Sequence, residues 1–433
     1  MIPQSSFMVV APVAAGQEEE LRKLLASMND RVGVVDPLNR LIPFGRLERL
    51  HFSRFVLLDD ATLDDVTVYG GPRVRYGLSL AFLADFDGPA DEFLADLLQR
   101  AGDGLRRIFA HCDGFAPDGN LLRWMKEREY RAAANYVNWR GRTMRQIREE
   151  AAVRNALVAH LRTQATAVAA MDPRGVRDML VNFVHREQQA GRLPLTPEPR
   201  TPLGWRLRNV AHAVVGPLVA LLLLPLLLLY LPLFVYQLRR RERSDPEIAP
   251  RPDPEHARKL ADIEDHDATN QFSALGSAKP GRFRRWLLVV ALWGLDYAAR
   301  HVYSRGHLTR VTTIHFARWV FLDDKQRLLF ASNYDGSLES YMDDFINKVG
   351  WGLNLVFSNG VGYPRTDWLV FGGAKDEQKF KRFLRRHELA TEVWYNAHPG
   401  LTAVDLARNT RIREGLERPR LTDAEIRQWL QLL

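Results

Sequence analysis

The chain has 433 residues, of which 46% are hydrophobic and 26% are charged. These proportions are typical of a folded soluble protein and exclude a disordered chain or a polytopic membrane protein. The net charge of +8 favours anionic partners, either nucleic acid or anionic lipid. The single cysteine, Cys112, excludes an internal disulfide and a multi-cysteine metal site.

The first predicted elements alternate between strand and helix patterns. The N-terminus has no basic segment before its short apolar run, so it is not typical of a signal peptide, and we expect the soluble parts to be cytoplasmic. The elements follow the order βαββαβ, which is that of a ferredoxin-like fold. They are expected at residues 7–13, 17–28, 51–58, 78–86, 90–107 and 108–112.

An uncharged segment follows in the middle of the chain. No Asp, Glu, Lys or Arg occurs from Ala211 to Gln237, whereas arginines flank both ends. A membrane-spanning helix needs about 20 apolar residues, so one span is possible. Three prolines would interrupt such a helix, and Pro225 lies near its middle. We therefore predict a re-entrant hairpin with both ends in the cytoplasm, and a single span or a buried core helix as alternatives.

Proline-rich strings on either side of this segment suggest linkers. The predicted organisation is a first repeat with following helices, a linker, the membrane-attaching hairpin, a second linker and a second repeat with C-terminal helices. The corresponding ranges are residues 1–193, 194–204, 205–243, 244–270 and 271–433.

The second half of the chain repeats strings of the first half. Residues 50–60 match residues 314–324 at seven of eleven positions, and residues 82–88 match residues 330–336 at three of seven. We predict an α+β fold in which two tandem duplicated ferredoxin-like repeats pack as a pseudo-dimeric α/β barrel. Packing of the two sheets requires both on one side of a membrane, which favours the hairpin over a single span.

The elements of the second repeat are predicted in the same order. Their ranges are residues 272–275, 284–303, 315–322, 327–334, 338–349 and 353–358. The apolar run at residues 286–295 is too short to span a bilayer, so we interpret it as a core helix, with an interfacial helix as the alternative.

Candidate site residues occur mainly in the second repeat. Asn333 and Asp335 end a predicted strand and would face a cavity mouth, although Asp335 also suits helix capping. His315 and Arg318 are three residues apart in a strand, so their side chains should point to opposite faces. The recurrence of His-Phe-x-Arg in both repeats favours a structural role, for instance Arg318 pairing with a following Asp, over a functional one. His398 lies in a turn, as a solvated side chain or a ligand.

Other features of the sequence are weaker candidates for a functional site. His111 and Cys112 are interpreted as a buried strand-end pair, with metal or haem ligation as the alternative. The sequence shows no phosphate-binding loop, hydrolase motif or zinc spacing. The Arg-rich stretches at residues 140–148 and 382–386 alternate with apolar residues, which favours solvated helix faces or anionic-lipid contacts over nucleic-acid binding.

The strings Ile314–Trp319 and Ser332–Ser337 resemble a family of mostly uncharacterised bacterial proteins. More distantly, the tandem ferredoxin-like plan is similar to the dimeric α/β-barrel superfamily, which includes dye-decolorising peroxidases and chlorite-dismutase-like haem proteins. Those peroxidases use an Asp in a Gly-x-x-Asp-Gly loop, a distal Arg and a proximal His on haem iron. This chain keeps the Asp-Gly of that loop but lacks the leading Gly.

The resemblance implies a membrane-attached oxidoreductase, haem-dependent and peroxidase-like, that acts on an apolar or lipid substrate. Asp335 would then be the acid/base, Arg318 would polarise the oxidant beside Asn333, and His315 or His398 would bind haem. The alternative is a non-catalytic lipid-binding or scaffold protein at the membrane surface. Both hypotheses expect membrane lipid and an anionic surface as partners, and neither involves nucleic acid.

Overall fold

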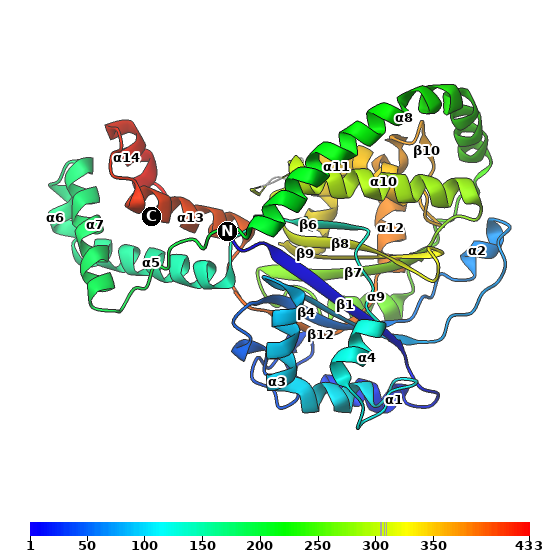
Figure 1. Cartoon of the computed structure of the whole chain (residues 1–433), viewed down its shortest axis with the longest axis horizontal. Coiled ribbons are helices and arrows are strands. Elements are labelled where there is room, and N and C mark those ends of the chain that lie inside the picture. The colour runs from blue at the N-terminus through cyan, green and yellow to red at the C-terminus, as the bar shows by residue number, and fades with distance from the viewer. Residues whose placement is uncertain (304, 307, 309) are drawn as a thin grey trace.

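The computed structural model describes residues 1–303, 305–306, 308 and 310–433. The fold is mixed α+β. Two four-stranded antiparallel sheets are stacked on each other, helices cover their outer faces, a helical arm projects from one end, and one long apolar helix runs along the body (Figure 1).

The first sheet has the strand order β1-β5-β4-β12 and is antiparallel throughout. Helices α1, α3 and α4 cover its outer face, where apolar side chains of the strands and helices form one buried cluster. The bounds are β1 Gln4–Pro12, β4 Leu50–Leu58, β5 Ser79–Asp87, β12 Thr391–Asn396, α1 Glu18–Ala26, α3 Ala90–Phe109 and α4 Leu121–Glu127.

The second sheet has the order β6-β8-β9-β7, and helices α10, α11 and α12 cover its outer face. Residues of strand β8 alternate between the helix side and the sheet–sheet side, as the period of two requires. The bounds are β6 Ala134–Val137, β7 Thr269–Ser277, β8 Ile314–Leu322, β9 Arg327–Asp335, α10 Arg282–His301, α11 Leu338–Phe357 and α12 Glu377–His387.

The fourth strand of each sheet comes from the other half of the chain. Strand β6 follows the first-sheet helices but pairs with β8, and β12 follows the second-sheet helices but pairs with β4. At the two seams between the sheets only the isolated bridges Val9↔Glu129 and Ala274↔Glu388 occur. The expected barrel is therefore not closed in the described part of the chain, because the seams lack continuous hydrogen-bonded ladders.

The prediction of a last strand in each repeat, at residues 108–112 and 353–358, is wrong. Residues 108–109 end helix α3, and residues 353–357 end helix α11, so both apolar runs are the buried last turns of helices. Ile108 and Val356 pack into the cores beneath the sheets. A short apolar run does not by itself distinguish a buried helix end from a strand, which explains the error.

The space between the sheets is filled with aliphatic side chains from both sheets. Met8, Val56 and Leu83 of the first sheet contact Val320 and Leu329 of the second in one buried cluster. The sheets therefore enclose a packed core at their centre, and any cavity between the sheets must lie toward the ends of the stack.

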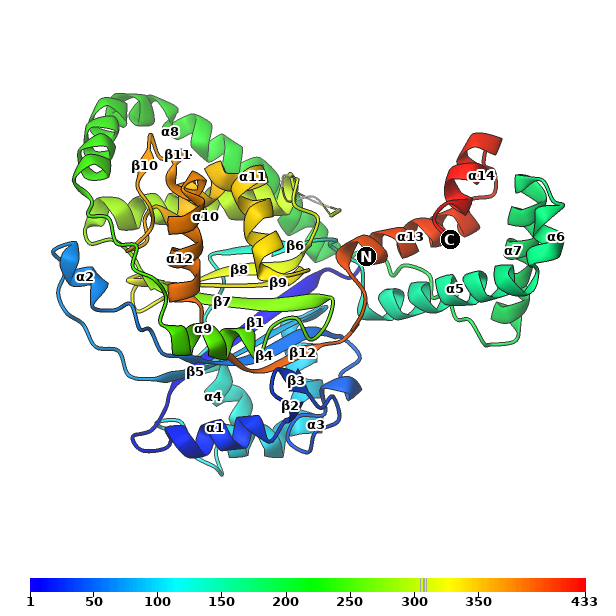
Figure 2. The same ribbon diagram turned by 180° about the vertical axis from the view of Figure 1, so that it is seen from behind.

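The helical arm consists of five helices from both halves of the chain (Figure 2). A buried cluster that includes Leu157, Leu180 and Trp429 holds the helices together. Helices α5 and α13 both begin where the arm joins the sheets. The bounds are α5 Met144–Thr163, α6 Ala165–Ala169, α7 Pro173–Gln189, α13 Ala403–Glu417 and α14 Asp423–Leu430.

The uncharged segment lies in helix α8, Leu203–Ser244, a single helix of 42 residues. The predicted hairpin of two half-helices is wrong, because Pro217, Pro225 and Pro232 are all incorporated within the helix. Each proline removes only one backbone donor, and the remaining turns keep their hydrogen bonds. In Figure 1 the helix runs straight along α10 and then bends around the end of the body.

The remaining elements are short. They are β2 Asn29–Arg31, β3 Val34–Val35, α2 Asp65–Val68, α9 Pro254–Ala261, β10 Thr366–Asp367 and β11 Phe371–Gly372, with 3-10 turns at Phe44–Arg46 and Gly373–Lys375.

Candidate functional site

Two buried histidine–aspartate pairs lie at the ends of the central strands, next to the base of the arm. Nε2 of His315 lies 2.7 Å from Oδ1 of Asp335, and Nε2 of His51 lies 2.8 Å from Oδ1 of Asp87. All four side chains are buried. The structure thus brings the predicted residues His315 and Asp335 together, and it adds an equivalent pair in the first sheet.

The second oxygen of each carboxylate binds the first turn of an arm helix. Oδ2 of Asp87 accepts the amide N–H of Met144 at 2.8 Å, and Oδ2 of Asp335 accepts that of Ala403 at 2.7 Å. A carboxylate at a helix N-terminus is stabilised by the unpaired amides and the helix dipole. Each aspartate therefore connects a strand end, a histidine and an arm helix.

His398 lies beside these pairs with no hydrogen bond to its ring. Its ring centroid is 5.1 Å from that of Phe52 and 5.3 Å from that of His315. The residue is only 4% exposed, and in the described part of the chain neither Nδ1 nor Nε2 has a partner. Burial holds the pKa of His398 well below its usual value, and the neighbouring His315 and His51 lower it further. The ring is therefore neutral, with one nitrogen that can accept a proton and one that can donate.

The cavity next to His398 is small, and both polar and apolar side chains line it. His51, His315 and His398 line it together with Asn138 and Arg142, and the space open to the centre of a water molecule is about 20 Å³. That volume holds about one water molecule. The residues therefore do not fit a haem in this conformation, although a histidine with free ring nitrogens is the kind of ligand that haem iron binds.

The predicted residues Arg318 and Asn333 lie away from this cavity, between the sheets. Arg318 donates to the carbonyl oxygens of Phe7 and Ala84, both at 3.0 Å, and to the carboxylate of Asp85. Asn333 accepts from Arg54. Arg318 therefore pairs with an aspartate of the opposite sheet rather than with one that follows it in sequence.

Arg54 and Arg318 make reciprocal contacts between the sheets. Arg54 donates to the carbonyl oxygens of Phe272 and Ser332, at 2.8 and 2.9 Å, just as Arg318 does to the first sheet. The pKa of Arg54 is lowered to about 9, mainly by burial; the carboxylate of Asp85 opposes this shift and the charge of Arg318 adds to it. These contacts hold the sheets together at a polar position within an otherwise apolar interface.

The surroundings of His111 and Cys112 differ from each other. His111 is partly exposed, and its Nδ1 lies 2.9 Å from Oε1 of Gln17, whereas burial raises the pKa of the Cys112 thiol to about 12. A protonated thiol is a poor metal ligand. Among the described residues no group of three or more His, Cys, Asp or Glu side chains is arranged to hold a metal ion.

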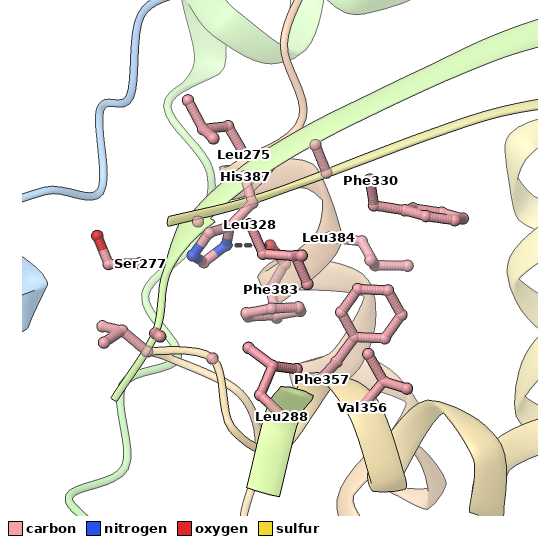
Figure 3. Close-up of a pocket in the computed structure, with 15 residues that line it drawn as sticks. Leu275, Ser277, Leu288, Leu328, Phe330, Val356, Phe357, Phe383, Leu384 and His387 are labelled. Atoms are coloured by element: carbon pink, nitrogen blue, oxygen red, sulfur yellow. Dashed lines mark hydrogen bonds between the residues drawn. The ribbon is translucent and has the colours of Figure 1, made fainter. Parts of the chain in front are cut away.

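A second cavity, which the sequence did not indicate, lies between strands β7 and β9 and helices α11 and α12 (Figure 3). Its lining is almost entirely apolar, with Phe330, Phe357 and Phe383 among the labelled residues. Nδ1 of His387 lies 2.8 Å from the carbonyl oxygen of Phe383, and burial lowers the pKa of that histidine. The free space of about 40 Å³ is too small for a lipid.

No family model, no curated protein and no solved structure matches the chain.

Proposed function

We propose that the protein is a membrane-attached lipid-binding or scaffold protein, held on one membrane face by helix α8. The observation that carries this proposal is the uncharged stretch of α8, most of whose side chains are exposed while both ends of the helix are fixed to the same body. A helix whose two ends are fixed to the same body can enter a membrane from one face only, with its apolar residues in the hydrocarbon.

The exposed side chains of α8 favour lipid as the surrounding medium. None of its most apolar window is buried, and Leu222 and Leu229 are 77% and 80% exposed. Each leucine that passes from water into hydrocarbon contributes roughly 1.5–3 kcal/mol. A contiguous apolar surface of this length is far larger than single exposed side chains on a soluble protein, and it marks an interaction site.

Contacts at both ends fix α8 to the body. Near its start, Nδ1 of His212 lies 2.9 Å from Nε2 of His301, and the Tyr297 hydroxyl donates to the carbonyl of Ala213. Near its end, the buried Glu242 accepts the amide N–H of Leu369 at 2.7 Å. Both ends therefore lie on one side of any membrane that the middle of the helix enters.

Helix α10 adds two exposed tryptophan side chains next to this surface. Trp286 and Trp293 are 42% and 48% exposed, and both lie next to α8, where Trp286 contacts Tyr230. Tryptophan is enriched at membrane–water interfaces. The opposite face of α10 packs into the core through Leu288 and Leu292. In this proposal helix α10 has one face in the core and one face at the membrane surface.

We infer, as the finer description of the fold, that the body arose by tandem duplication of a ferredoxin-like unit. The reciprocal contacts of Arg54 and Arg318 and the matching His–Asp pairs support it. This origin agrees with membrane attachment on one face, because both units share one interface and cannot be separated by a bilayer.

Flotation with lipid vesicles tests the membrane proposal. The full chain should float with phosphatidylcholine vesicles, and the variant L222K/L229K should float much less, because it places two charges in the apolar stretch. The matched control V32K/L38K changes two exposed apolar residues elsewhere and should float like the wild type. Flotation of L222K/L229K at the wild-type level would contradict the proposal.

Protease treatment of the same vesicles tests the orientation. Linkers on both sides of α8, residues 194–202 and 245–253, should be cut from the same side of a sealed vesicle. Protection of one linker alone would mean that α8 spans the bilayer.

A second candidate is an oxidoreductase-like activity on an apolar substrate, favoured by the unpartnered ring of His398 beside the His315–Asp335 pair. Asp335 would orient His315, and His398 would exchange a proton through its free nitrogens. An absorbance scan of the purified protein tests the haem-dependent form. A Soret band that H398A abolishes would show that the cavity opens to admit haem, and a colourless protein would remove that form.

A further inference from the structure

A basic hollow lies where the loop after β6, the first turns of α8 and the end of α10 meet. Its volume is about 290 Å³. Four arginines and two residues of α8 contribute to its wall: Arg140, Arg142, Arg300, Arg305, Trp205 and Asn209. Neither proposed function uses this hollow, although Arg142 also lines the histidine cavity.

Arg142 is the clearest sign that the hollow binds a ligand. The residue is 5% exposed, and its Nε and Nη2 atoms have no hydrogen-bond partner in the described part of the chain. Its guanidinium group lies over the ring of Trp139, 4.0 Å from the ring centroid. Buried donors without partners cost free energy, and a ligand with acceptor oxygens would remove that cost.

The charge of the hollow is unbalanced. Among the described residues none of its four arginines forms an ion pair with a carboxylate. Of its two acidic residues, Glu198 is exposed, and Glu150 accepts a hydrogen bond from Thr410 and lies 3.9 Å from Arg413. Burial lowers the pKa of Arg140, and the charge of Arg300 lowers it further, although Asp296 opposes the shift. An anion is the ligand that this field attracts.

The position of the hollow indicates where the anion comes from. Trp205 and Asn209 belong to the turns of α8 immediately before the uncharged stretch. Leu207 and Val210, in the same turns, are 70% and 55% exposed. If the middle of α8 lies in hydrocarbon, these turns lie at the depth of the lipid headgroups, where tryptophan and arginine are favoured.

We propose that this hollow binds the phosphate group of an anionic phospholipid, whose acyl chains lie along the exposed face of α8. Planar guanidinium groups form paired hydrogen bonds with phosphate oxygens, which suits a cluster of arginines with free donors. The lipid source of the phosphate rests on the proposed membrane attachment, whereas the anion site itself does not.

Calorimetric titration of the full chain, kept soluble in a neutral detergent, tests the site. Water-soluble dihexanoyl phosphatidylglycerol should bind more tightly than dihexanoyl phosphatidylcholine. R140Q/R142Q should weaken that binding about tenfold or more, because charge-assisted hydrogen bonds are lost. The control R107Q/R411Q removes two exposed arginines elsewhere and should bind like the wild type.

A second variant distinguishes loss of the binding site from a folding defect. R300Q/R305Q alters the less buried side of the hollow and should weaken binding in the same direction, with an unchanged circular dichroism spectrum. Wild-type affinity in both variants would overturn the site. Binding of inorganic phosphate as tight as that of the short-chain lipid would overturn the lipid source.

Flotation separates this inference from membrane attachment. R140Q/R142Q should still float with purely phosphatidylcholine vesicles, because α8 is intact, and should lose the extra binding that phosphatidylglycerol confers on the wild type. A wild type that does not float with any vesicle contradicts the attachment. A wild type that floats equally well on both vesicles overturns the headgroup site alone.

Discussion

Arg318 of the second sheet donates to the carboxylate of Asp85 in the first sheet. At the matching position Arg54 donates instead to the neutral amide oxygen of Asn333. Two buried guanidinium groups therefore share one carboxylate in the space between the sheets, and the stability of the stack depends on that carboxylate.

The first prediction concerns this shared charge. D85N should lower the free energy of unfolding by about 3–5 kcal/mol, because it leaves both guanidinium groups without a counter-ion. N333D should restore most of that loss in the double variant D85N/N333D, since it returns one carboxylate to the same space. Chemical denaturation measures all three proteins. A loss below about 1 kcal/mol in D85N would contradict the argument.

The second prediction concerns the pH dependence caused by His398. Its folded-state pKa lies well below that of the unfolded chain. As the pH falls through about 6.5, the unfolded state gains a proton that the folded state does not, so stability falls. H398F should remove this contribution. It should match the wild type at pH 7 within about 1 kcal/mol and exceed it by roughly 2 kcal/mol at pH 5.

Denaturation at several pH values, with the histidine signals followed by NMR, checks this outcome. Equal acid sensitivity in H398F and the wild type would show that other groups cause the pH dependence.

The third prediction concerns the end of α8. Glu242 accepts the amide N–H groups of Trp368 and Leu369 and the hydroxyl of Thr366, and it pairs with Arg239. E242A should destabilise the protein by about 3 kcal/mol, because two buried donors and one partly buried donor lose their acceptor. The end of α8 should then become sensitive to proteolysis. The control E255A, in the exposed first turn of α9, should leave the cleavage pattern unchanged.

The fourth prediction compares two glycines of helix α3. A Cβ on Gly104 would lie 1.9 Å from the carbonyl oxygen of Leu41, whereas a Cβ on Gly102 would meet nothing within 4 Å. G104A should therefore destabilise the protein by about 3 kcal/mol or more, and G102A should stabilise it by roughly 0.5–1 kcal/mol. Thermal unfolding of the two variants measures both changes in stability. A tolerated G104A would show that α3 can move away from residue 41.

The sequence was a good guide wherever the pattern was local. The strands that carry His51 and His315 and the first helix of each half occur where the patterns predicted them. The separation of His315 from Arg318 agrees with the two-residue period of a strand, although the register of β8 shifts at a bulge between Ile314 and Phe316. Arg54, by contrast, finds its partners in the other sheet, and no local pattern indicates such a contact.

The fourth strand of each sheet was missed for the same reason. Its pairing partner lies far away in sequence, and its own apolar pattern is short. A signal was nevertheless present, since Tyr136, Gly141 and Thr143 have the same spacing as Tyr395, Gly400 and Thr402. In both places the threonine forms a capping box at the start of an arm helix.

The exchange of β6 and β12 makes the two halves depend on each other during folding. Residues 1–193 alone would lack β12, so β4 would become an open edge with a row of unpaired backbone groups, and β6 would have no sheet to join. We expect this fragment to aggregate when produced by itself and to become soluble when it is co-expressed with residues 245–433. The partner that each half needs is thus supplied by the same polypeptide, and only after the whole chain has been synthesised.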